Sequence, residues 1–201
     1  MVKADCGGCN GCSRCCHDMG NSIILDPYDV YRMTTGMGKS MQELLAASVE
    51  LNVVDGVILP NLKMQGTEEA CAYLDEEGRC SIHPYRPGIC RLFPLGRYYE
   101  NGGFSYFLQT GECAKENRSK IKVSKWIDTP DLTRNQQFSL QWHDLLHAME
   151  ERLTGEDEGK QREENLLLLR LFYLLPYEGT IDFYTQFTER MEHWNGQNGQ
   201  I

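Results

Sequence analysis

The first sixteen residues hold five of the nine cysteines of this 201-residue chain, at spacings typical of metal ligands. These are Cys6, Cys9, Cys12, Cys15 and Cys16, and the later four are Cys71, Cys80, Cys90 and Cys113. A short loop rich in Gly, Asn and Ser can bring several sulfurs within the roughly 2.3 Å that zinc needs, or a similar distance from iron. The pattern therefore predicts a cysteine-ligated metal site.

The doubled cysteine at the end of this run, Cys15-Cys16, favours more than one metal centre. Adjacent side chains in extended backbone point to opposite sides, so these two most simply serve two metals, or one metal and one other role. With Cys6 set aside, eight sulfurs remain, which matches two four-coordinate sites without any histidine. We therefore expect two centres.

The identity of the metal stays open. Three cysteines in one Cys-x-x-Cys-x-x-Cys run are typical of loops that bind a [4Fe-4S] cluster, whereas structural zinc usually takes separated Cys-x-x-Cys pairs. Here the run ends in a doubled cysteine, and the proline typical of the iron–sulfur loops is absent. Zinc and iron, the latter mononuclear or in an iron–sulfur cluster, fit about equally well.

Other interpretations of the cysteines fit less well. Free cysteine often acts as a small buried apolar residue, but the Gly, Asn, Ser and Arg residues between Cys9 and Cys16 build no apolar core. A disulfide framework belongs to oxidising compartments, and this N-terminus shows no apolar leader segment. We therefore expect reduced thiols and a cytoplasmic protein.

The histidines are weaker candidates. His17 and His83 lie near cysteines, where they could replace a thiolate or donate a hydrogen bond to a liganded sulfur. His143 and His147 stand four residues apart, as in a helical zinc pair, but the general-base Glu of that motif is missing. We expect the latter pair to be surface residues.

Four motifs together resemble a known family. They are Cys9-x-x-Cys12-x-x-Cys15-Cys16, Cys71 to Cys80 followed by Ser-Ile-His, Arg86-Pro87-Gly-Ile-Cys90-Arg91-Leu-Phe-Pro, and Cys113. This order resembles the CxxCxxCC, or YkgJ-type, zinc- or iron-chelating proteins. The resemblance covers about residues 6 to 115 and implies eight ligands: Cys9, Cys12, Cys15, Cys16, Cys71, Cys80, Cys90 and Cys113. Cys6 is an extra cysteine.

The same resemblance bears on activity. A flagellin lysine methylase with a related cysteine motif is thought to use an iron–sulfur cluster, which implies methyl transfer as one activity. No glycine-rich nucleotide loop supports that activity in this sequence, and no P-loop or Ser/His/Asp arrangement stands out. Whether the chain is an enzyme stays open.

Composition divides the chain into two parts. All nine cysteines lie at or before Cys113, and residues 126–201 carry 14 acidic residues against 6 basic ones. We predict a cysteine-cluster metal-binding domain over 1–125 and an acidic helical subdomain over 126–201. Neither part has the basic surface of a nucleic-acid binder. The longest apolar stretch, 166–175, is about half the length of a membrane span and contains an arginine.

The expected fold is α+β. In the Cys-rich region, Asp26-Pro27 and Ser40 with Glu43 predict the starts of two short helices. Short antiparallel hairpins should follow around turns at 55–56, 75–78 and 100–103. Cys71 and Cys80 should lie on paired strands. Thr129 as N-cap and Pro130 as first residue predict the first of about three C-terminal helices, near 130–153, 160–175 and 180–194. The first has an apolar stripe from Phe138 to Leu153.

Three functional hypotheses follow. The first is a metal-binding protein that chelates zinc or iron through eight cysteines. The second is an iron–sulfur-dependent enzyme or electron carrier. The third is a zinc-stabilised interaction module that docks a protein partner through its acidic helical half, with the 166–175 helix as the contact face.

Overall fold

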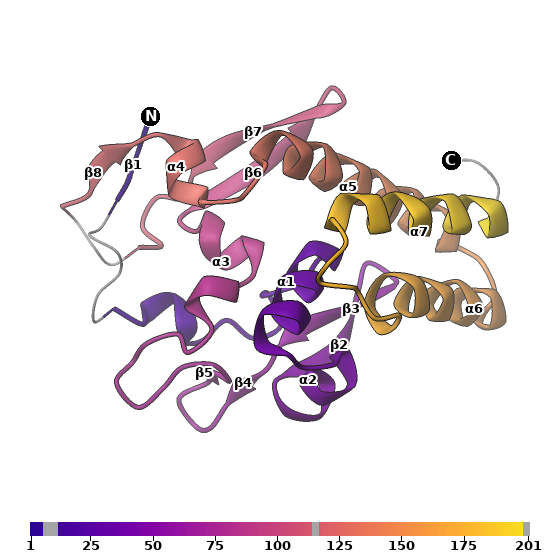
Figure 1. The fold of residues 1–201 in the computed structure, drawn as a ribbon, viewed down its shortest axis with the longest axis horizontal. Coiled ribbons are helices and arrows are strands. Elements are labelled where there is room, and N and C mark those ends of the chain that lie inside the picture. Colours follow the sequence, from indigo (N-terminus) through magenta and orange to yellow (C-terminus); the bar gives the residue numbers. More distant parts are fainter. Residues whose placement is uncertain (6–11, 114–116, 199–201) are drawn as a thin grey trace.

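Hairpins and short helices form the first half of the chain, and long helices form the second half (Figure 1). The computed structural model describes residues 1–5, 12–113 and 117–198. Its strands form four two-stranded antiparallel sheets within these residues. This arrangement confirms the predicted α+β class, with hairpins and short helices followed by C-terminal helices. None of the described helices has the length and apolar character to cross a membrane.

Capping boxes begin the first two helices. Asp26 is the N-cap of α1 (Pro27–Met37), and its side chain accepts the Asp29 N–H. The Asp29 side chain in turn accepts the Asp26 N–H at 3.2 Å. Ser40 and Glu43 form the same box at the start of α2 (Met41–Ala47). Both predicted helix starts are confirmed, because these reciprocal hydrogen bonds satisfy N–H groups that a helix leaves free at its start.

Two of the three predicted hairpins are confirmed. Strands β2 (Val49–Val54) and β3 (Val57–Leu62) pair in full register around Asp55-Gly56. Both turn residues have positive φ, as tight hairpin turns require. Strands β6 (Leu95–Glu100) and β7 (Gly103–Leu108) pair in the same way.

The third hairpin forms only next to its turn: the Ser81 N–H donates to the Tyr73 carbonyl at 2.9 Å, but the prediction that Cys71 and Cys80 lie on paired strands is wrong. Cys71 lies in β5 (Ala70–Cys71), which pairs with β4 (Met64–Gln65), and Cys80 makes only a single bridge to Leu74. The Asp75 carboxylate accepts the Arg79 N–H and closes a tight turn, and a 3₁₀ turn at His83–Tyr85 soon ends the extended backbone. Only one bridge fits between these two turns.

The sequence did not predict two short helices, which lie on either side of the β6–β7 hairpin, nor one of the strand pairs. Helix α3 (Gly88–Leu92) carries Cys90, and α4 (Val123–Ile127) packs against it. Strand β1 (Val2–Asp5) pairs with β8 (Ser119–Ile121). This pairing ties the N-terminal end of the chain to the segment that follows Cys113.

The C-terminal part contains the expected three helices, α5 (Leu132–Leu153), α6 (Glu158–Leu169) and α7 (Phe183–Asn198). The start of α5 differs from the prediction: Asp131 is the N-cap, in a left-handed conformation, and Pro130 precedes it. The Asp131 side chain accepts the Arg134 N–H, which explains why the cap lies two residues beyond Thr129. A π-helical turn at Arg170–Leu174 follows α6.

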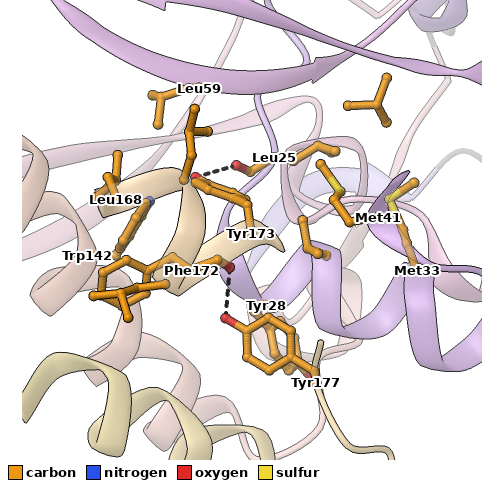
Figure 2. Close-up of a cluster of buried hydrophobic side chains, with 14 of the residues drawn as sticks. Leu25, Tyr28, Met33, Met41, Leu59, Trp142, Leu168, Phe172, Tyr173 and Tyr177 are labelled. Carbon is orange, nitrogen blue, oxygen red and sulfur yellow. Dashed lines mark hydrogen bonds between the residues drawn. The ribbon is translucent and has the colours of Figure 1, made fainter. Parts of the chain in front are cut away.

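One hydrophobic core connects the two halves of the chain (Figure 2). Tyr173, from the turn after α6, donates a hydrogen bond to the Leu25 carbonyl at 3.0 Å. Trp142 of α5 packs edge-on against Phe172, with ring centroids 5.1 Å apart. The predicted apolar stripe of α5 is confirmed. Leu146 is partly buried against the core, and the other members are buried: Phe138, Trp142, Leu145, Met149 and Leu153. The division into domains at 125/126 stays a prediction.

Candidate metal centre

Five thiols line one pocket of about 460 Å³. They belong to Cys15, Cys16, Cys71, Cys80 and Cys90, all of them free and partly buried. Cys15 and Cys16 lie in a 3₁₀ turn at Arg14–Cys16, and Cys71 lies in β5. Cys80 forms the bridge to Leu74, and Cys90 lies in α3. Segments up to 75 residues apart in the sequence therefore present sulfur to the same space.

Backbone pairing explains how the N-terminal cysteines reach this pocket. His17 forms a bridge with Ala70, directly before Cys71, and the Asp18 N–H donates to the Glu69 carbonyl at 3.1 Å. The His17 ring also lies 3.3 Å from the Glu68 carbonyl through Nδ1. These contacts hold the Arg14–Cys16 turn beside β5.

Cys15 and Cys16 face the same pocket, which corrects the expectation that they point to opposite sides. That expectation assumed extended backbone, but these residues lie in a 3₁₀ turn, with the Cys16 N–H donating to the Ser13 carbonyl at 2.8 Å. A hydrogen bond from the Cys16 thiol to Cys15 lowers the pKa of Cys15 to about 6, and the positive charge of Arg86 contributes. The same bond, together with burial, raises the pKa of Cys16.

The other three thiols keep their protons more firmly. Burial is the main cause that raises the pKa of Cys71, Cys80 and Cys90, and the charge of neighbouring cysteines adds to each rise. Such mutual repulsion is expected where several thiolates face one space. A bound cation would instead lower the pKa values of these thiols, because thiolate is the form that binds metal.

Basic and apolar side chains complete the pocket wall. Arg14, Arg86 and His17 supply the basic groups, and Met19, Met64 and Phe93 are among the apolar ones. Arg86 thus fits the role of offsetting thiolate charge. Arg91 does not share that position: it is 4% exposed, with its guanidinium 5.8 Å from the centre of the Tyr28 ring in α1.

The remaining candidates lie elsewhere or outside the described residues. Cys12 and Cys113 are free and partly buried but are not among the residues that line the pocket. Cys9 and Cys6 lie outside the described residues. Among the residues that are described, no group of three or more Cys, His, Asp or Glu is arranged to hold a single ion. The eight-cysteine ligand set stays a prediction.

The histidines differ in position. His17 lines the pocket, whereas His83 is exposed on its 3₁₀ turn. His147 is exposed, as expected, and approaches Glu151 at 3.6 Å. His143 is only partly exposed, because its ring stacks on Tyr99 with centroids 3.8 Å apart. The spacing of residues 143 and 147 on α5 gave no sign of this contact with β6.

Comparison with known families defines the class of this protein. The family model "CxxCxxCC: putative zinc- or iron-chelating domain" matches residues 8–117, which is more than half of the chain. The chain belongs to this family of zinc- or iron-chelating domains, as its cysteine motifs predicted. No curated protein and no solved structure matches it.

Proposed function

We propose that the protein holds several metal ions together in the thiol pocket, as one polynuclear centre, and that this centre is an iron–sulfur cluster. The observation that carries the proposal is the convergence of five thiols from four separate segments on one cavity of about 460 Å³. The family supports zinc or iron as the metal. The form of the centre is our inference from the pocket.

The number of thiols on the pocket favours a cluster over a single zinc ion. Four thiolates complete the tetrahedral shell of one zinc ion, which leaves no position for the fifth thiol. A cluster contains several irons and inorganic sulfides, so its protein thiolates stand farther apart around a larger volume. The lining of this pocket therefore fits a polynuclear centre, and one shared centre replaces the two separate sites expected from the cysteine count.

The chain's own residues prepare the pocket for such a group. Cys15 is poised as a thiolate at neutral pH, and Arg86 offsets negative charge beside it. The apolar side chains on the wall limit water, which, with burial, helps set the reduction potential of a cluster. When bound, an iron–sulfur cluster supplies one-electron transfer. Because thiols persist in reducing compartments, we place the protein in the cytoplasm.

A structural zinc centre is the second candidate. The segments that carry Cys15, Cys16 and Cys71 belong to elements of two or three residues, which have few backbone hydrogen bonds of their own. Metal binding would then supply folding free energy to this region. The docking of a partner on the acidic helices stays a prediction; Leu166 and Leu175, at the ends of the proposed contact face, are about half exposed.

The deciding experiment is elemental analysis with an ultraviolet–visible spectrum on anaerobically purified protein. We expect several iron equivalents per chain, acid-labile sulfide, and a broad band near roughly 400 nm that dithionite bleaches. A colourless protein that carries zinc and less than one iron equivalent would refute the cluster and support the second candidate. Less than one equivalent of any metal would refute both.

Substitutions separate ligands from bystanders. Cys71→Ser and Cys90→Ser should each lower the metal content, because both thiols line the pocket. Cys6→Ser is the matched control: it removes a thiol from the same N-terminal run, but one that the family's eight-cysteine pattern does not include. Equal metal loss in all three variants would argue against this ligand set.

A further inference from the structure

Behind the thiol pocket, a buried carboxylate of α1 accepts a hydrogen bond from the start of α3, the helix that also carries the buried Arg91. Asp29 is 2% exposed and Arg91 is 4% exposed. The Asp29 Oδ1 atom accepts the Gly88 N–H at 2.7 Å, at the first residue of α3. A Cβ at Gly88 would lie 3.5 Å from that oxygen and 3.9 Å from Arg91 Nη2. The carboxylate and the guanidinium therefore converge on the start of this helix.

The periodicity of α3 places these contacts opposite Cys90. At about 100° per residue, Gly88, Arg91 and Leu92 share one face of the helix, and Ile89, Cys90 and Phe93 share the other. The second group lines the thiol pocket. Of the first group, Arg91 and Leu92 are buried away from it. Any rotation of this five-residue helix would move Arg91 and Cys90 together.

The local energetics make this contact hard to release. Both oxygens of Asp29 are engaged, since Oδ2 accepts the Asp26 N–H. Burial raises the pKa of Asp29, and the positive charge of Arg91 opposes that rise. If α3 turned away, the buried carboxylate would lose the Gly88 N–H, and leaving such a group without its partner is costly. The Asp29–Gly88 hydrogen bond therefore constrains the start of α3.

We infer that Asp29 and Arg91 are positioning residues of the metal centre, which fix the orientation of α3 so that Cys90 faces the thiol pocket. This inference rests on the proposed function, because it takes Cys90 as a ligand. Neither residue lines the pocket, so both act through the backbone of α3, and the negative charge of Asp29 in addition raises the pKa of Cys90. Groups behind metal ligands typically change metal affinity about 10- to 100-fold when they are mutated.

The test combines metal affinity with the chemical reactivity of Cys90. Asp29→Asn removes the charge that faces Arg91 and puts an amide donor beside the Asp26 N–H. We expect metal affinity, measured by competition with a chelator, to fall about 10- to 100-fold. Losing the Asp29 charge by itself lowers the pKa of Cys90, so the rate of alkylation by iodoacetamide is measured as a function of pH and expressed per thiolate. In metal-free protein this corrected rate should become several-fold faster for Cys90 and should not change for Cys71. Unchanged affinity and unchanged Cys90 labelling would overturn the inference.

Two controls separate positioning from general loss of structure. Glu43→Gln changes the corresponding residue of the α2 capping box, which is exposed, and should alter neither measurement. If Asp29→Asn does not fold, Arg91→Met and Arg91→Lys take its place. The methionine should weaken metal binding and expose Cys90, and the lysine, which keeps the charge, should restore most of both. Equal behaviour of these two variants would contradict the inference.

The labelling also keeps the two proposals apart. If the wild-type protein binds no metal, the proposed function fails, and Cys90 labelling in the metal-free protein still decides the role of Asp29. If the wild type binds metal but Asp29→Asn matches it in affinity and labelling, only the positioning inference fails.

Discussion

At the scale of single residues, the Cys15–Cys16 pair differs most from an ordinary set of thiols. The hydrogen bond between them lowers the pKa of one and raises that of the other, so the two share a single proton near neutral pH. Such a pair titrates as a unit. One member is therefore a thiolate before any metal arrives, which makes it the natural first ligand.

This sharing predicts an order of thiol reactivity. At pH 7 a thiol with a pKa of about 6 is about nine-tenths thiolate, whereas a thiol with a pKa above 9 is at most about 1% thiolate. The lower nucleophilicity of the more acidic thiolate offsets part of this difference, so in metal-free protein Cys15 should react with iodoacetamide at least several-fold faster than Cys80 or Cys90. Its rate should fall as the pH drops through about 6, because the reactive thiolate becomes protonated. Mass spectrometry of the labelled peptides measures each rate.

The control for this prediction is Cys16→Ala, which removes the donor of the hydrogen bond. The pKa of Cys15 should then rise, and its labelling at pH 7 should slow. A rate for wild-type Cys15 that follows the ordinary thiol pKa of about 8.5 would contradict the sharing of a proton.

At the scale of elements, a single buried asparagine joins α6 to the β2–β3 hairpin. Asn165 is 4% exposed; it accepts the Ile58 N–H at 2.6 Å and donates to the Gly56 carbonyl at 3.2 Å. The side chain thus satisfies two backbone groups at the turn end of the hairpin. Gly56 is exposed and Ile58 is half-buried, so the buried end of this contact is the Asn165 side chain, which needs both backbone partners; the contact therefore fixes how the hairpin packs on the helix.

Asn165→Ala should therefore destabilise the protein by about 1–3 kcal/mol, because it leaves the Ile58 N–H and the Gly56 carbonyl without their partner. Urea unfolding followed by circular dichroism measures the change in free energy of unfolding. Gln141→Ala, at an exposed position of α5, is the control and should change it by less than about 0.5 kcal/mol. A similar, small effect of both variants would show that the hairpin does not depend on this contact.

The sequence predicts those elements whose signals are local. Asp26-Pro27, Ser40 with Glu43, and Asp55-Gly56 act within a few residues, so each marks its helix or turn correctly. Pairing over longer distances is not visible in this way. The two-residue strand that contains Cys71 pairs with β4, and β1 pairs with β8, which lies more than 110 residues away in the sequence.

The candidate site shows the same limit. The motifs identify the cysteines, and the structure brings five of them to one pocket. That Cys15 and Cys16 face the same side depends on a 3₁₀ turn that the residue spacing does not indicate. Asp29 is visible in the sequence only as an acid in the first turn of a helix, and its contact with Gly88 depends on the packing of α1 against α3.

At the scale of the whole molecule, the cysteine-bearing half and the helical half share one core. Leu25 and Tyr28 of the first half pack with Tyr173, Phe172 and Phe183 of the second, within a single cluster of buried side chains. The thiol pocket borders this cluster, since Cys71, Cys80 and Cys90 pack against it. Stability of the helices and integrity of the pocket should therefore be linked.

We accordingly expect one cooperative unfolding transition, seen alike by helix circular dichroism and by labelling of Cys90. Phe172→Ala, at a fully buried position in the second half, should lower the free energy of unfolding by about 3–5 kcal/mol and shift both signals together. Leu166→Ala, at a position 54% exposed, should shift neither. Two separate transitions, with Phe172→Ala affecting only the helical signal, would instead show that residues 1–125 and 126–201 fold as independent domains.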